Sequence, residues 1–195
     1  MILLKNIKLE LAEDLYFACK QDIDLIIKDL KSESVFSYAI LGNSGFDSLS
    51  SCACTRKRLE SYTHELFEQG LTQKKACLIA ESSSDLWDYL NKNSQFFRSV
   101  DKLIEKVQDA FYDGEIEDIT DDTTDLDDFF FDISVQVLSK LKDDNIFKTK
   151  PFEIDMFLGI QFSDPTDGAK KYILNSVEKL SSENWYQKML EAYSS

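Results

Sequence analysis

Apolar residues occupy every second position after Pro151, and the residues between them are mostly polar. Successive side chains of a β-strand point to opposite faces, so a period of two predicts a strand with one buried face. The apolar positions are Phe152, Ile154, Met156, Leu158, Ile160 and Phe162. This stretch is the clearest strand in the chain.

Apolar residues at helical spacing predict most of the remaining elements. A first helix over residues 7–31 carries Asp22 as the one polar residue on its apolar face. Thr55 can cap a helix that runs to Gln69, with Gly70 at its end. Further helices are expected around Trp87, over residues 96–111, and after Gly168. The clearest helix has apolar residues at Leu126, Phe129, Phe130, Ile133, Val137, Leu138 and Leu141.

Three shorter β-rich runs accompany the strand that follows Pro151. Residues 35–41 and 49–54 flank a turn over residues 42–45 and predict a hairpin, and residues 75–80 predict a further strand. A hairpin followed by grouped helices predicts an α+β fold, with a mainly antiparallel sheet of about four strands covered by helices on one side. The length of 195 residues fits a single domain over residues 1–195.

The chain is strongly acidic. It has 36 acidic and 22 basic residues, and its formal net charge is −14. Such a surface repels phosphate groups and anionic lipids, so we expect neither a nucleic acid nor a membrane as partner. It attracts basic proteins and cations, although solubility alone is the simpler explanation of the charge.

The sequence also predicts a cytoplasmic location. No apolar run reaches the ~20 residues that cross a bilayer, and the first eight residues lack the features of a signal peptide. We therefore expect Cys19, Cys52, Cys54 and Cys77 to be reduced thiols that pack as small apolar residues.

No motif for catalysis or cofactor binding is present. His64, the single histidine, is expected on the exposed side of its helix, four residues from Glu60 and from Glu68. Cys52, Cys54 and Cys77 fall short of the four ligands that a zinc site needs. Glycine-rich phosphate-binding patterns are missing. We expect no catalytic residue, no metal and no cofactor.

An acidic segment is the most unusual feature of the chain, since no Lys or Arg lies between Lys106 and Lys140. Acids in a first helical turn complement the helix dipole, which accounts for Asp125, Asp127 and Asp128. The remaining acids form either a solvated loop or a docking patch for a basic protein. A calcium loop is a third alternative, but the spacing of its ligands is missing. The candidate docking residues are Asp113, Glu115, Glu117, Asp118, Asp121 and Asp122.

A basic triplet, Arg56-Lys57-Arg58, follows Thr55. Positive charge at a helix start opposes the helix dipole. The placement therefore indicates a use, either in an ion pair across the surface or in contact with an acidic partner.

Several short motifs resemble the bacterial family DUF4303 in order and spacing. They are Phe36-Ser37-Tyr38-Ala39-Ile40, Cys54-Thr55 leading into Leu59, the serine run before Trp87, Asp128-Phe129, and Phe162-Ser163-Asp164. The resemblance implies no assigned enzymatic role, and such families include candidate immunity proteins encoded beside toxin genes. The chain departs from the family pattern in its basic triplet, where acids are expected, and in having one tryptophan near position 87.

These observations favour a non-catalytic, immunity-type protein that neutralises a bacterial toxin by direct contact through an acidic surface. One alternative is an enzyme of unfamiliar type that uses Asp85 and Asp88 beside Trp87, with or without a divalent metal. Another is a structural or adaptor module. The sequence leaves the oligomeric state open.

Overall fold

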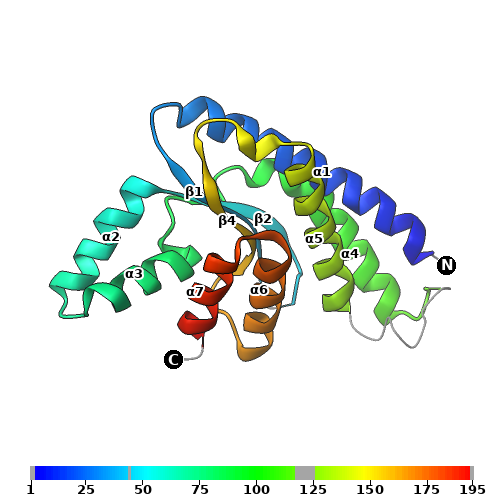
Figure 1. Cartoon of the computed structure of the whole chain (residues 1–195). Coiled ribbons are helices and arrows are strands. Elements are labelled where there is room, and N and C mark those ends of the chain that lie inside the picture. Colours follow the sequence, from blue (N-terminus) through cyan, green and yellow to red (C-terminus); the bar gives the residue numbers. More distant parts are fainter. Residues whose placement is uncertain (1–2, 44, 117–125, 194–195) are drawn as a thin grey trace.

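The computed structural model describes residues 3–43, 45–116 and 126–193. Its helices and strands follow the order α1 (Leu4–Asp29), β1 (Val35–Gly42), β2 (Leu49–Thr55), α2 (Arg56–Glu68), α3 (Gln73–Ser82), β3 (Tyr89–Leu90), α4 (Arg98–Tyr112), α5 (Leu126–Asp143), β4 (Phe152–Phe162), α6 (Asp167–Leu180) and α7 (Glu183–Tyr193). Short 3-10 turns at Ser84–Leu86, Ser94–Phe97 and Ile146–Lys148 join some of them. In Figure 1, α2 and α3 lie at one end of the molecule and α1, α4 and α5 at the other.

The sheet has the strand order β3-β2-β1-β4. β1 pairs antiparallel with β2 and parallel with β4, and β2 pairs antiparallel with β3. Parallel strands need a long connection, and here α2 to α5 lie between β1 and β4 in the chain. The predicted α+β fold is confirmed, with a sheet that is mixed rather than purely antiparallel.

Helices cover both faces of the sheet, whereas the sequence predicted cover on one side only. Every residue of β1 and of β2 is buried, and β4 is buried without interruption from Met156 to Phe162. On one face Tyr38 lies beside Cys19 and Asp22 of α1. On the other face Gly159 lies against Ser176 and Val177 of α6. A strand covered on both faces does not need a strict alternation of polar and apolar residues.

The strands of the first hairpin and α2 begin and end within one residue of the positions that the sequence predicted. The Thr55 hydroxyl accepts a hydrogen bond from Arg58 N at 3.2 Å, as expected of an N-cap. Gly70 follows α2 with a φ of +95°, a conformation that glycine adopts at little cost. These two residues define the start and the end of α2 as predicted.

The strand predicted over residues 75–80 is wrong, because these residues belong to α3. Thr72 caps this helix and accepts from Lys75 N at 3.3 Å. Ala76 and Ala80, four residues apart, are buried, as are Glu81 and Ser82 at its end. The apolar run is too short for its period to distinguish a helix from a strand.

The helix predicted around Trp87 is also wrong. A 3-10 turn ends at Leu86, and β3 follows at Tyr89–Leu90, paired with Ala53 and Cys52. The fourth strand of the sheet is thus a two-residue pairing beside a turn.

The start of β4 departs from the predicted burial. Val35 of β1 pairs with Phe152, but Ser37 pairs with Phe157, so β4 has extra residues that bulge away from its neighbour. Ile154 lies in this bulge and its side chain is fully exposed, at 108%. The period of two assigned Ile154 to the core because it cannot register inserted residues.

Side chains of the segment around α6 close the outer edge of β4. Leu158 N donates to Ser181 Oγ at 2.8 Å, and this hydroxyl donates to Leu158 O at 2.8 Å. Ile160 N donates to Ser176 Oγ at 2.9 Å. Because these backbone groups are already bonded, a further strand cannot pair with them.

None of the helices in the described part of the chain is both long enough and apolar enough to cross a membrane.

Replacing Gly159 by alanine is expected to lower the free energy of unfolding by about 1 to 3 kcal/mol. A Cβ at this position would lie 3.0 Å from Ser176 Oγ and 3.2 Å from Val177 Cγ2, so α6 would have to shift. Urea unfolding measures the change. Gly168→Ala is the matched control, since the nearest atom to its Cβ is Thr166 Oγ1 at 3.8 Å. Equal stability of Gly159→Ala and wild type would contradict this account of the packing.

Candidate functional site

Exposed carboxylates gather on the C-terminal half of α4. Glu105, Asp109, Asp113 and Glu115 are all exposed. Together with Lys102, Lys106 and Ala110 they surround a hollow of about 300 Å³. Of the predicted docking residues, Asp113 and Glu115 therefore lie on this acidic face, as we call the four carboxylates. The others, Glu117, Asp118, Asp121 and Asp122, lie outside the described residues.

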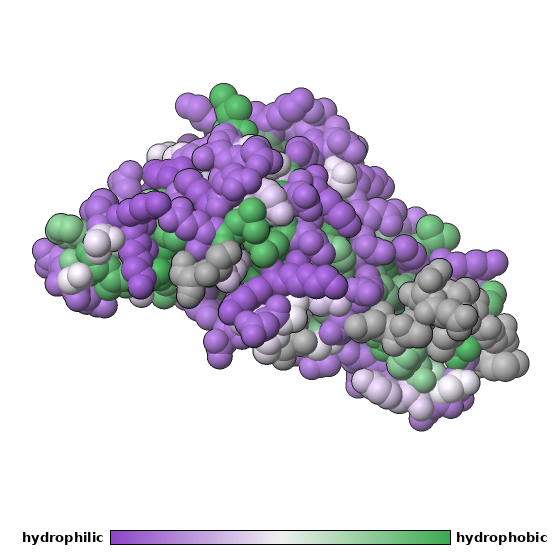
Figure 2. All heavy atoms as spheres, turned by 60° about the horizontal axis from the view of Figure 1, so that its bottom comes forward, coloured by the Kyte–Doolittle hydropathy of each residue, from purple (hydrophilic) through white to green (hydrophobic). Residues whose placement is uncertain are grey.

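Tyr112 is the aromatic residue of this region that sequence reasoning missed. Its side chain is 82% exposed, and its ring meets the Phe111 ring edge-on at 5.8 Å between centroids. It lies three residues after Asp109 and next to Asp113. Figure 2 shows one face of the molecule as largely hydrophilic with smaller apolar patches. Among the exposed aromatic rings of the described residues, that of Tyr112 is more exposed than those of Phe17 and Phe67.

The charge of the acidic face opposes the helix that carries it. The last turn of α4 has no basic residue, and Asp113 occupies the C-cap. A helix C-terminus has a partial negative charge and is stabilised by cations, so Asp109 and Asp113 are placed unfavourably. These two carboxylates are also four residues apart, where like charges repel. A cationic group bound here would remove both costs.

Two of the three acids expected to complement the helix dipole of α5 lie at its start, and the third, Asp125, lies outside the described residues. Asp127 and Asp128 lie in its first turn, where negative charge is favourable. Asp128 Oδ1 also accepts a hydrogen bond from the Tyr172 hydroxyl at 2.8 Å, which joins α5 to α6.

The carboxylates considered for an enzyme occupy different settings. Asp88 binds the start of α2, since its two oxygens accept from Thr55 N at 3.0 Å and from Thr55 Oγ1 at 2.7 Å. Asp85 is exposed on a 3-10 turn. Trp87 between them is buried, and its Nε1 donates to Ala80 O at 3.4 Å. Asp88 is thus part of the scaffold.

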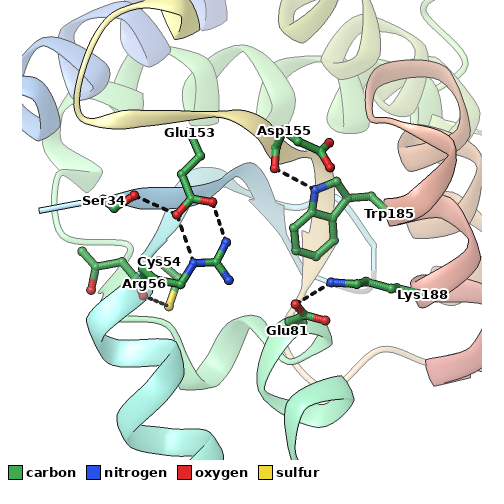
Figure 3. Close-up of polar contacts among 9 residues, drawn as sticks. Ser34, Cys54, Arg56, Glu81, Glu153, Asp155, Trp185 and Lys188 are labelled. Atoms are coloured by element: carbon green, nitrogen blue, oxygen red, sulfur yellow. Dashed lines mark hydrogen bonds and ion pairs between the residues drawn. The ribbon is translucent and has the colours of Figure 1, made fainter. Parts of the chain in front are cut away.

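Arg56 forms an ion pair across the surface, one of the two uses predicted for the basic triplet. Its Nε donates to Glu153 Oε1 at 3.0 Å and its Nη2 to Glu153 Oε2 (Figure 3). Ser34 Oγ donates to the same carboxylate at 2.7 Å. The guanidinium carbon lies 4.9 Å from the centre of the Phe36 ring. Arg56 and Ser34 lower the pKa of Glu153. This contact joins the start of α2 to β4.

Four aromatic rings pack beside this ion pair in a closed cycle. Phe36 contacts Trp87 and Trp185, and Phe157 contacts the same two rings, with centroids 5.6 to 6.1 Å apart. Lys188 extends over Trp185 and donates to buried Glu81 at 2.7 Å (Figure 3). The cycle joins β1, β4 and α7 to the segment that leads into β3. It stabilises the fold and presents no open surface of its own.

Asp22 is the buried carboxyl group of α1, with 2% of its surface exposed. Asn93 Nδ2 donates to its Oδ1 at 2.7 Å. Burial raises the pKa of Asp22, and hydrogen bonding only partly opposes this shift. Its polar character within an apolar face was visible in the sequence, but the partner Asn93 was not.

Three of the four thiols are buried, and the histidine is exposed. Cys19, Cys52 and Cys54 are buried as expected, whereas Cys77 is partly exposed. Burial raises the pKa of Cys52 and raises that of Cys54 to about 12, so the thiolate is disfavoured. The His64 side chain is 71% exposed, as predicted. In the part of the chain that the structure describes, no group of three or more His, Cys, Asp or Glu could hold a metal ion.

Replacing Asp22 by asparagine is expected to raise the free energy of unfolding at pH 7 by about 1 to 3 kcal/mol. The raised pKa means that the fold binds the proton more tightly than the unfolded chain. Wild type therefore loses stability as the pH rises from about 3.8 through the raised pKa of Asp22. Asparagine stays neutral and still accepts from Asn93.

Urea unfolding of wild type and Asp22→Asn between about pH 3 and pH 8 tests this assignment. The difference between their free energies of unfolding should grow as the pH rises. Asp24→Asn, an exposed change on the same helix, should leave the wild-type profile unaltered. Parallel profiles for wild type and Asp22→Asn would refute the assignment.

Replacing Arg56 by glutamine is expected to lower the free energy of unfolding by about 1 kcal/mol or less, since both partners are partly exposed. The lowered pKa of Glu153 adds stability above about pH 4.5, which is lost as the pH falls through that lowered pKa. The decrease in the free energy of unfolding on acidification should therefore be smaller in Arg56→Gln than in wild type. Thermal melts at acidic and neutral pH measure this decrease. Arg58→Gln is the control, because it removes the same charge from the start of α2, and Arg58 contacts Glu65 and Leu86 O rather than Glu153.

Comparison with known proteins supports the resemblance noted in the sequence. The model of one family matches residues 15–181. This range includes all four strands and leaves out only the start of α1 and the whole of α7 among the helices and strands described above. No curated protein and no solved structure matches the chain. The chain belongs to the family described as Domain of unknown function (DUF4303).

Proposed function

We propose that the chain is a non-catalytic binding protein of the immunity type, which neutralises a basic protein toxin by direct contact. The acidic face of α4, with the exposed ring of Tyr112, is the surface that binds. The observation that carries the proposal is the position of Asp109 and Asp113 at the C-terminal end of α4. Both are costly to the isolated protein and favourable beside a cation.

Contact with a basic partner explains this placement. Lysine or arginine side chains of a partner can pair with Asp109 and Asp113 and also complement the negative end of the helix dipole. Tyr112 offers a flat ring with few rotatable bonds, and tyrosine is enriched among the residues that contribute most to binding energy. A polar rim around an aromatic residue is typical of protein interfaces.

The net charge acts over a longer range than these contacts. A charge of −14 attracts a basic protein before contact and raises the association rate, and salt weakens this effect. Many toxins that act on nucleic acid are basic, and an acidic protein can cover their active surface. The proposal places the protein in the cytoplasm, with a protein partner and no nucleic acid or membrane.

The binding surface is tested by reversing its charge. The probe is the product of the adjacent gene, copurified with wild type and with Asp109→Lys/Asp113→Lys, and then with Tyr112→Ala. The double variant should bind more than tenfold more weakly, because two attractive contacts become repulsive. It should also fail to protect cells that express the probe. Tyr112→Ala should weaken binding with the net charge unchanged.

Glu60→Lys/Glu68→Lys is the matched control. It makes the same change in net charge on α2, which lies at the other end of the molecule (Figure 1). This control should bind and protect as wild type does. An equal loss in both double variants would show that net charge alone acts, and absence of binding by wild type would refute the proposal.

A further inference from the structure

The bulge of β4 presents an apolar side chain to solvent. Ile154 is fully exposed, between Glu153 and exposed Asp155. The bulge is fixed from both sides: Glu153 is bound by Arg56, and Asp155 O accepts from Trp185 Nε1 at 3.2 Å. In Figure 3 these contacts lie on the same short stretch of strand. A rigid support that displays an isoleucine is a ready anchor for a protein contact.

A cavity of about 290 Å³ lies directly beside Ile154. Its apolar lining includes Met156 and Leu180, and its charged lining consists of Lys142 and Lys148 with Glu153 and Asp155. Two of these charges already have partners within the chain, since Glu153 is paired with Arg56 and Lys142 Nζ donates to Leu180 O at 2.7 Å. The remaining cation and anion, Lys148 and Asp155, balance each other, although the chain as a whole has a charge of −14. An anchor and a cavity with balanced charge therefore lie in one patch.

Such a patch matches a second copy of itself. In a two-fold symmetric contact the same surface faces itself, so the surface must be self-complementary in shape and in charge. Two copies of a strongly acidic chain repel each other over most of their surfaces. A neutral patch that offers cations opposite anions is where this repulsion is weakest.

The closed edge of β4 limits the form of the contact. Ser181 Oγ bonds the backbone N and O of Leu158, and Ser176 Oγ accepts from the backbone N of Ile160. These bonds oppose pairing of two β4 strands across the symmetry axis at Leu158 and Ile160, and we assign the contact to side chains.

We propose that this surface is the interface of a two-fold symmetric homodimer, in which Ile154 of each copy enters the cavity of the other. Lys148 of one copy then faces Asp155 of the other. This contact is separate from the acidic face of α4. The hollow of the acidic face is lined by α4 and the residues directly after it, whereas this cavity is lined by α5, β4, the end of α6 and the turns beside them, and the two linings have no residue in common.

Mass measurement in solution tests the proposal. Light scattering after gel filtration, from about 1 to about 100 µM protein, covers the affinities of weak interfaces. Wild type should approach twice the mass of one chain as its concentration rises. Ile154→Asp should weaken self-association more than tenfold, because it places a carboxylate in the cavity. Leu9→Asp is the matched control, an exposed apolar residue on α1, and should dimerise as wild type does.

A charge exchange separates a homodimer from a site for another protein. Lys148→Asp alone and Asp155→Lys alone should each weaken the dimer, since like charges then face each other. The two changes together restore opposite charges and should restore dimerisation. Circular dichroism confirms that each variant is folded. A wild type that stays monomeric throughout, a dimer that survives Ile154→Asp, or a double exchange without rescue would overturn the proposal.

Discussion

The parallel pairing of β1 with β4 is the contact on which the rest of the structure depends. It joins residues 35–42 to residues 152–162 and closes the chain around four helices. It also places the central strands between two helical layers, which requires both faces to be apolar. Phe36 and Phe157, on neighbouring strands, then complete the aromatic cycle with Trp87 and Trp185. Loss of this pairing would remove β4, and α6 that packs on it, from the rest of the sheet.

Long elements with a sustained period could be predicted from the sequence. The helices α1, α2, α4 and α5, the first hairpin, and β4 were all expected in these places. Residues 75–80 were assigned wrongly, because a run of six residues is too short for its period to distinguish a strand from a helix. β3 escaped prediction because two residues carry no pattern, and its pairing is set by the turn before it. The parallel direction of β4 depends on the path of the intervening helices, which local spacing does not encode.

At the candidate sites too, features set by neighbouring residues could be predicted, whereas contacts between residues far apart in the sequence could not. An unfavourable charge at a helix end was a local signal, and it led to the ion pair of Arg56. The partner Glu153 lies 97 residues away and could not be inferred. Asp22 was recognisable as a polar residue on an apolar face, whereas Tyr112 and Ile154 were not recognisable as exposed. Their exposure follows from which neighbours the fold leaves uncovered.

The two serine hydroxyls that occupy the margin of β4 have a consequence for solubility. An apolar strand such as Met156–Phe162 would nucleate intermolecular β-structure if its margin were bare. Ser176 and Ser181 lie in or directly after α6, so this protection lasts only while that helix stays docked. Transient detachment of α6 would expose the strand without global unfolding. We therefore expect the availability of this strand for intermolecular pairing to follow the local stability of α6 rather than the stability of the whole fold.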